Sequence, residues 1–288
     1  MHMIETTRLH IEPSTSDPLL AGDTSYSPHV RKRIYYIAQL FNTWISYDYG
    51  RCRVIPRGAS CSLPGEDWTA DEIAIWRLTD SLDPDRRLDS TELENLLLQA
   101  SELTLSHSAL ELKRCNIALC IYRRLRVSGR VVSSKALSQV LHLTDIGIDN
   151  ATEMARRHLP WWHIVNVPFQ IICVLLAIDT RASLERVGKS VSTLRLVASV
   201  YGTSAIQDTF VSACSLIRIH MRRKMEDYEL LSRVEEDMMA WEGDSSVLPP
   251  SSLPNAFISQ PVEMPKDDVG ESWDLDFLLS SSLFTPWG

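Results

Sequence analysis

The sequence lacks the short motifs by which many enzymes are recognised. It has 11 glycines in 288 residues, and none of them forms a phosphate-binding loop, a dinucleotide fingerprint or a G-x-S-x-G nucleophile elbow. Its six cysteines contain no C-x-x-C pair, which is the spacing typical of zinc and redox sites. We therefore interpret the cysteines as reduced intracellular thiols. The sequence gives no specific support for an enzyme, a cofactor or a metal site.

The sequence also lacks a net positive charge and an uninterrupted long apolar segment. The formal net charge is −8, so the chain as a whole does not attract the phosphate backbone of DNA. The first residues, MHMIETTRLHIEP, lack the apolar region of about 7 to 15 residues found in signal peptides. The most apolar run, LPWWHIVNVPFQIICVLLAIDT (159–180), is interrupted by His163, Asn166 and Gln170, whereas a membrane span needs about 20 mostly apolar residues. We therefore expect neither secretion nor a membrane span.

Two histidines and a glutamate near this run raise the alternative of a metal site. The H-E-x-x-H motif places two histidines four residues apart on one face of a helix, with the glutamate between them. Here His158 and His163 are five residues apart, Pro160 separates them, and Glu153 precedes both. We prefer a helix terminus at which His158 meets the negative end of the helix dipole. No catalytic, cofactor-binding or metal-ligating residue is predicted.

Apolar residues recur every three or four positions through most of the chain, which predicts an all-α fold. We expect helices to begin near residues 28, 69, 90, 133, 168, 183 and 204, with a break in the third near 105–108. Thr69–Glu72 and Ser204–Gln207 have the pattern of a capping box, and Gly202 is a natural helix stop. The last helix can extend to Trp241.

Two prolines divide the apolar run. Pro160 and Pro168 can each occupy the first turn of a helix, where a missing amide costs nothing. This predicts a short helical turn that carries Trp161 and Trp162, then a second helix that starts at Pro168 and is capped by Asn166. The apolar residues that follow Pro168 should form a buried helix at the centre of the domain.

Four short basic clusters lie on the predicted helices. They occupy residues 31–33, 123–126, 156–157 and 222–224. Each lies beside apolar positions, so we interpret it as the solvated face of its helix. A short import signal or a set of phosphate contacts is the alternative interpretation.

Composition divides the chain into three regions. Residues 1–27 are expected to form an irregular lead-in, residues 28–242 a helical domain, and residues 243–288 a disordered tail in which prolines lie among serines. The tail has seven Asp or Glu residues and one Lys, which gives it a charge of −6 out of −8 for the whole chain. The acidity of the protein is therefore mostly that of its tail.

The end of the tail, ESWDLDFLLSSSLFTPWG, mixes carboxylates with large apolar groups. This composition is typical of disordered activation segments. The carboxylates keep the apolar groups solvated, and a shallow groove on a partner can bind them as a transient helix. We predict Trp273, Phe277, Leu278 and Phe284 as activating contacts. A tail that folds back onto its own domain is the alternative.

Four blocks of sequence lie in order between residues 28 and 240: RKRIYYIAQLFNTWISYDYGRCRVI, CSLPGEDW, LPWWHIVNVPFQIICVLLAIDT and SVSTLRLVASVYGT. Together they resemble the regulatory middle homology region of fungal zinc binuclear cluster transcription factors. The resemblance implies a nuclear, helical regulatory domain that controls RNA polymerase II genes, such as a metabolic or secondary-metabolite cluster. It also implies a coactivator or a related transcription factor as partner, in a homodimer or heterodimer.

The six-cysteine cluster that contacts DNA in that family is absent from the sequence, and none of the cysteines from Cys52 to Cys214 maps onto it. The segment TTRLHIEPS also resembles the end of a helix that others normally precede. A truncated gene model, a fragment that works through partners and a regulator without its own DNA-binding module are the three alternatives. We expect DNA contact only through a missing or partner-supplied domain. The alternative functions are a non-catalytic dimerisation or modulator partner of a full-length zinc-cluster factor and, third, a small-molecule enzyme.

Overall fold

The computed structural model describes residues 1–12, 27–48, 51–61, 69–83, 86–129 and 131–244. Within these ranges the protein consists of nine helices and no strands, which confirms the predicted all-α class. The helices are α1 (His2–Thr6), α2 (Pro28–Asp48), α3 (Ala70–Asp80), α4 (Ser90–Glu102), α5 (Ser108–Val127), α6 (Ser134–Arg156), α7 (His163–Ile178), α8 (Arg181–Tyr201) and α9 (Ser204–Asp244). The four predicted activation contacts, Trp273, Phe277, Leu278 and Phe284, lie outside the described residues, and the domain limits stay a prediction.

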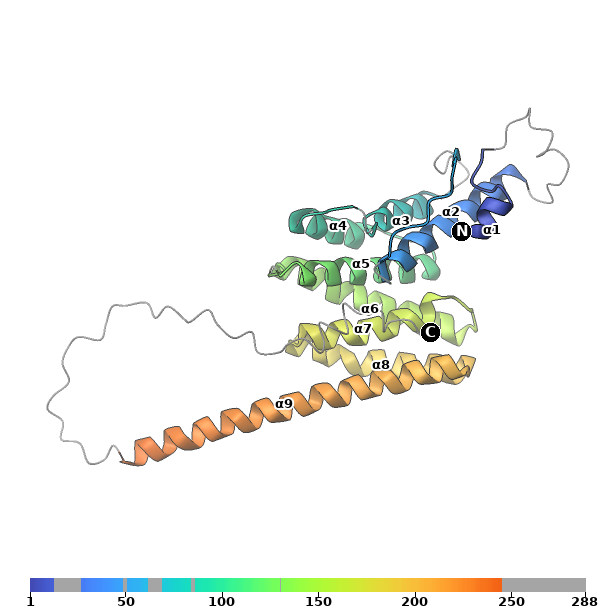
Figure 1. Ribbon diagram of the computed structural model, residues 1–288. Helices are drawn as coiled ribbons and strands as arrows, with labels where there is room; N and C mark the ends of the chain where they lie inside the picture. Colours follow the sequence, from blue (N-terminus) through green and yellow to red (C-terminus); the bar gives the residue numbers. More distant parts are fainter. Residues whose placement is uncertain (13–26, 49–50, 62–68, 84–85, 130, 245–288) are drawn as a thin grey trace.

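The helices form a stack in which each layer packs on the next (Figure 1). Helices α2, α3 and α4 lie at one end, α5 to α8 follow, and α9 crosses the other end. The main apolar core extends through the stack from Trp44 of α2 to Ile206 of α9. Helix α7 lies at its centre and packs against α5, α6, α8 and α9, as the sequence predicted for its apolar residues. Among the described helices, none is long and apolar enough to cross a membrane.

Local capping signals determine most of the helix ends. The predicted capping box at the start of α3 is present, because the Thr69 side chain accepts from the Glu72 amide while the Glu72 side chain accepts from the Thr69 amide. Helix α8 ends at Gly202, whose φ of 63° lies in the left-handed region that favours glycine. The predicted box at Ser204 is wrong. Thr203 instead accepts from the Ile206 amide, at 3.4 Å, and the Gln207 side chain donates to the Ala198 carbonyl.

The lead-in contains structure that the sequence did not predict. Residues 2–6 form the single-turn helix α1, and Ile4 packs with Tyr35 and Tyr36 of α2 in a small apolar cluster. His10 contacts the carbonyl oxygens of Ile4 and Arg57 through its two ring nitrogens, at 3.2 and 3.1 Å. The described part of the lead-in is therefore attached to α2 and to the connection that follows it.

The prediction of two helices separated at Pro168 is wrong. Helix α7 is continuous from His163 to Ile178, with Pro168 inside it, and Trp161 and Trp162 precede it. Proline removes one backbone hydrogen bond, which is costly in a helix interior, but nearly the whole of α7 is buried and this burial outweighs the loss. Asn166 is not a cap, because it lies within the helix and accepts a hydrogen bond from the Gln170 side chain at 3.3 Å.

One of the four basic clusters is not a solvated face. Arg123 is buried, with its guanidinium 5.6 Å from the centre of the Tyr47 ring. Arg124 donates to the Ser81 carbonyl oxygen at 2.8 Å and to that of Arg86. These side chains join α5 to α2 and to the end of α3, because backbone carbonyls beyond a helix end need donors. The cluster at 222–224, by contrast, is largely exposed, as predicted.

Two helical glycines are expected to respond oppositely to substitution by alanine. A Cβ atom on Gly147 of α6 would lie 2.6 Å from the Cys115 Sγ of α5 and 3.3 Å from the Ile171 side chain of α7, whereas one on Gly188 of α8 would meet nothing within 4 Å. Gly147→Ala should therefore lower the free energy of unfolding by about 1–3 kcal/mol. Gly188→Ala should raise it by about 0.5–1 kcal/mol. Urea denaturation measures both, and stabilisation by Gly147→Ala would contradict the close packing of α5 and α6.

Candidate functional site

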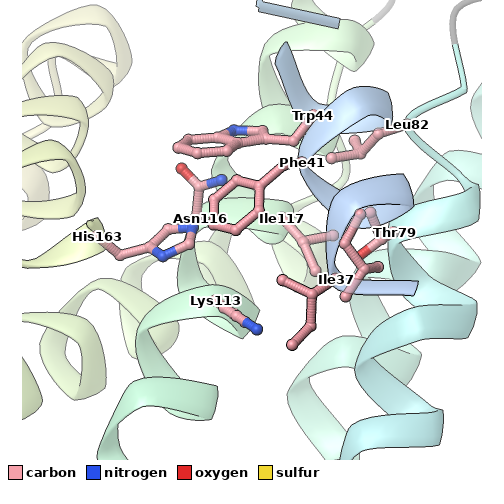
Figure 2. Close-up of a pocket in the computed structure, with 10 residues that line it drawn as sticks. Ile37, Phe41, Trp44, Thr79, Leu82, Lys113, Asn116, Ile117 and His163 are labelled. Carbon is pink, nitrogen blue, oxygen red and sulfur yellow. The ribbon is translucent and has the colours of Figure 1, made fainter. Parts of the chain in front are cut away.

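A small cavity lies where α2, α3, α5 and α7 meet (Figure 2). Its volume is about 30 Å³. Its lining comprises Ile37, Leu40, Phe41 and Trp44 of α2, Thr79 of α3, Leu82, Lys113, Asn116 and Ile117 of α5, and His163 of α7. A cavity of this size can hold a water molecule, but it is far smaller than the roughly 300–1,000 Å³ of a typical ligand site.

An aromatic cluster forms one wall of the cavity. The His163 ring stacks on Trp44, with 4.8 Å between ring centres, and lies nearly parallel to Trp161 at 6.2 Å. Trp162 meets Trp44 edge to face at 5.7 Å. Trp162, just before α7, and His163, its first residue, therefore pack on the single tryptophan of α2. This contact fixes α2 against the centre of the domain.

Polar groups on α5 and α7 face each other across the same cavity (Figure 2). The Asn116 Oδ1 and His163 Nδ1 atoms are buried and have no hydrogen-bond partner among the described residues. The Lys113 ammonium lies 5.2 Å from the centre of the Trp161 ring, and burial lowers the pKa of this lysine. Burial, with a smaller contribution from Lys113, lowers the pKa of His163 to about 3. The cavity thus presents an amide oxygen and a neutral imidazole to a water-sized polar group.

A second, larger hollow adjoins the first. It measures about 210 Å³ and shares Leu40 and Thr79 with the first cavity. The remaining lining residues are Tyr35, Tyr36, Gln39 and Thr43 of α2, Arg53, Cys61, and Trp76 and Asp80 of α3. Burial raises the pKa of the Tyr36 phenol and of the Cys61 thiol, so both stay protonated at neutral pH. The thiol and the phenol of this hollow are therefore not activated nucleophiles.

The alternative metal site is not assembled. His158 follows α6 with a φ of 54° and is exposed, whereas His163 is buried at the start of α7. Over the described ranges, no group of three His, Cys, Asp or Glu residues is placed to hold a metal ion. Sequence reasoning did not identify either hollow. The only signal was the set of aromatic residues at the end of α2 and before α7, and it did not indicate that the two segments meet.

Protonation of His163 is expected to destabilise the folded protein. The pKa of about 3 in the fold lies below the ordinary 6.5, so the associated stability is present above pH 6.5 and is lost as the pH falls toward 3. The wild type should lose about 1.4 kcal/mol more than His163→Phe between pH 7.5 and 5.5. Urea denaturation at both values measures this, with the exposed His142→Phe as control. Equal losses in wild type and His163→Phe would contradict a buried neutral His163.

Comparison with known proteins gives four informative relatives. The chain is 38% identical over 244 residues to the transcription factor kojR of Aspergillus flavus and to that of Aspergillus oryzae. The aligned residues make up 82% of this chain. It is 34% identical over 237 residues to Protein RDR1 of Gibberella zeae, and 28% identical over 244 residues to Protein RDR1 of Saccharomyces cerevisiae.

The matched region of the chain spans 44%, less than half, of the length of each of these relatives. No family model matches the chain, and no solved structure matches it. Over 82% of its length, the chain is therefore homologous to fungal proteins that include the kojR transcription factors.

Proposed function

We propose that the chain is a transcriptional regulator of RNA polymerase II genes in a fungal nucleus, made of a helical middle homology region and an acidic activating tail. The observation that carries the proposal is 38% identity to the kojR transcription factors over 82% of the chain. The all-helical stack agrees with the helical regulatory domain that the sequence resemblance implies. A metabolic or secondary-metabolite cluster is the proposed kind of target.

DNA contact is proposed to come from a zinc cluster outside these residues or from a partner. The sequence has no C-x-x-C pair, and its net charge of −8 does not favour phosphate backbones. The missing C-x-x-C pair also favours a second candidate function, a modulator that dimerises with a full-length zinc-cluster factor. Chromatin immunoprecipitation with and without that factor separates the two candidates. Sequence-specific DNA binding by the chain alone would contradict both.

The tail is the part whose activity can be tested directly. Fused to a heterologous DNA-binding domain, residues 243–288 should activate a reporter gene, because their apolar groups lie among carboxylates that keep them available to a coactivator. Replacing Trp273, Phe277, Leu278 and Phe284 with alanine should abolish most of this activity. Leu253, Phe257, Ile258 and Met264, replaced together with alanine, are the matched control. An inactive tail, or equal activity of both variants, would contradict the assignment.

A further inference from the structure

The larger of the two hollows beside α2 is accessible from the surface. Gln39, Arg53 and Trp76 are half-buried and form its rim, whereas Tyr36 and Thr79 are buried. Its volume of about 210 Å³ lies below the roughly 300–1,000 Å³ of a site for a drug-sized ligand, so it fits a molecule with a single ring. The small cavity continues from this hollow, because both are lined by Thr79 and by one leucine of α2.

The lining of the larger hollow favours an uncharged ring. Tyr36 and Trp76 meet edge to face, with 6.3 Å between ring centres, so a flat ring can pack on either of them. Both charged residues of this lining already have partners. The pairs are Arg53 with Asp83 and Asp80 with Arg86. A charged ligand would therefore break an ion pair or stay without a counter-ion, and both are costly.

The small cavity supplies a polar end for such a ligand. Asn116 and His163 are 2% and 4% exposed, and their Oδ1 and Nδ1 atoms have no hydrogen-bond partner among the described residues. Figure 2 shows the two side chains next to each other and close to Trp44. A hydroxyl group matches both atoms, because it donates to the amide oxygen and accepts from an imidazole N–H. It is also small enough for this cavity.

We propose that the two hollows together bind one small, uncharged ring compound that carries a hydroxyl group on a short arm. The ring packs on the aromatic side chains of the larger hollow, and the arm passes Leu40 and Thr79 so that the hydroxyl reaches Asn116 and His163. The Lys113 ammonium disfavours a cation in the small cavity, and the amide oxygen disfavours an anion. As an effector site the recess rests on the function proposed above, whereas ligand binding itself does not.

Three matched probes test the site on the full chain. Benzyl alcohol has a ring and one hydroxyl on a one-carbon arm, toluene lacks the hydroxyl, and benzoate carries a negative charge in its place. Saturation-transfer NMR titrations measure the three dissociation constants. Benzyl alcohol should bind. Toluene and benzoate should each bind at least about tenfold more weakly, because toluene leaves the buried polar atoms unpaired and benzoate brings a charge without a partner.

Substitutions locate the bound probe. Asn116→Leu replaces the amide with an apolar group of similar size, so benzyl alcohol should lose its preference over toluene. Gln39→Phe fills the larger hollow from its rim and should weaken the binding of benzyl alcohol by about tenfold or more. Gln170→Leu is the matched control, since that amide oxygen is also buried without a partner but lies on α7 outside both linings. It should leave all three dissociation constants unchanged.

The result can contradict the proposal in several ways. Absence of benzyl alcohol binding, equal binding of toluene, or unchanged binding by Gln39→Phe would each overturn it. Circular dichroism checks that each variant is folded, and Gln39→Phe decides alone if Asn116→Leu is not. Reporter activity of the tail is measured separately. A tail that activates in a chain that binds none of the probes would therefore remove the effector site and keep the regulator.

Discussion

Replacement of Trp44 with alanine is expected to lower the free energy of unfolding by about 3–5 kcal/mol. The indole is 6% exposed and is the only tryptophan of α2, and it stacks on His163 at 4.8 Å between ring centres. It also contacts Phe41 and Trp162, at 6.2 and 5.7 Å. Its removal would enlarge the cavity between α2, α5 and α7, whose walls can only partly collapse. Urea denaturation followed by circular dichroism measures the loss.

Trp162→Ala is the matched control, since that side chain is 44% exposed and should cost about 1 kcal/mol. Trp44→Phe should fall between the two, because it keeps an aromatic ring but loses part of the volume. Hydrogen exchange should show the amides of α2 opening first in Trp44→Ala, because α2 is then held mainly by α3. Equal losses for Trp44→Ala and Trp162→Ala would show that α2 is attached to the domain through other contacts.

Features determined by neighbouring residues could be predicted from the sequence. The capping box at Thr69, the stop at Gly202 and the break between α4 and α5 are confirmed because each depends on hydrogen bonds or conformations within one turn. The prediction placed helix α7 correctly in the core, but it began the helix at Pro168 rather than at His163. Proline prefers the first turn of a helix, but burial of the whole of α7 outweighs this preference at Pro168. The residues next to the proline do not indicate that burial.

Features that depend on distant contacts could not be predicted. Arg123 has the sequence context of a solvated residue, but in the fold Tyr47 of α2 lies against its guanidinium and the side chain is buried. The smaller hollow likewise depends on α2 lying against α5 and α7, and the larger one on α2 lying against α3 and the connection between them. The spacing of apolar residues on α9 is the same where they are buried, as at Ala213, and where they are exposed, as at Leu231. Periodicity therefore identified α9 as a helix but could not show where its packed half ends.

Replacement of Arg114 with leucine is expected to cost about 3–5 kcal/mol, since it leaves a largely buried carboxylate without its cation. The Arg114 side chain is 3% exposed, pairs with Glu111 one turn earlier on α5, and donates to the Leu103 and Ala100 carbonyl oxygens at the end of α4. Burial raises the pKa of Glu111, and Arg114 opposes this rise. In Arg114→Leu the pKa of Glu111 should rise further.

The loss should therefore be largest at neutral pH and smaller in acid, where Glu111 is protonated and needs no partner. Urea denaturation at pH 7.5 and 5 measures both values. The double variant Glu111→Gln/Arg114→Leu should recover part of the stability, because it removes the unpaired charge but not the unmet carbonyls of α4. The exposed Arg195→Leu is the control and should change stability by about 0.5 kcal/mol or less. A similar small effect of Arg114→Leu would show that the end of α4 is not held by this side chain.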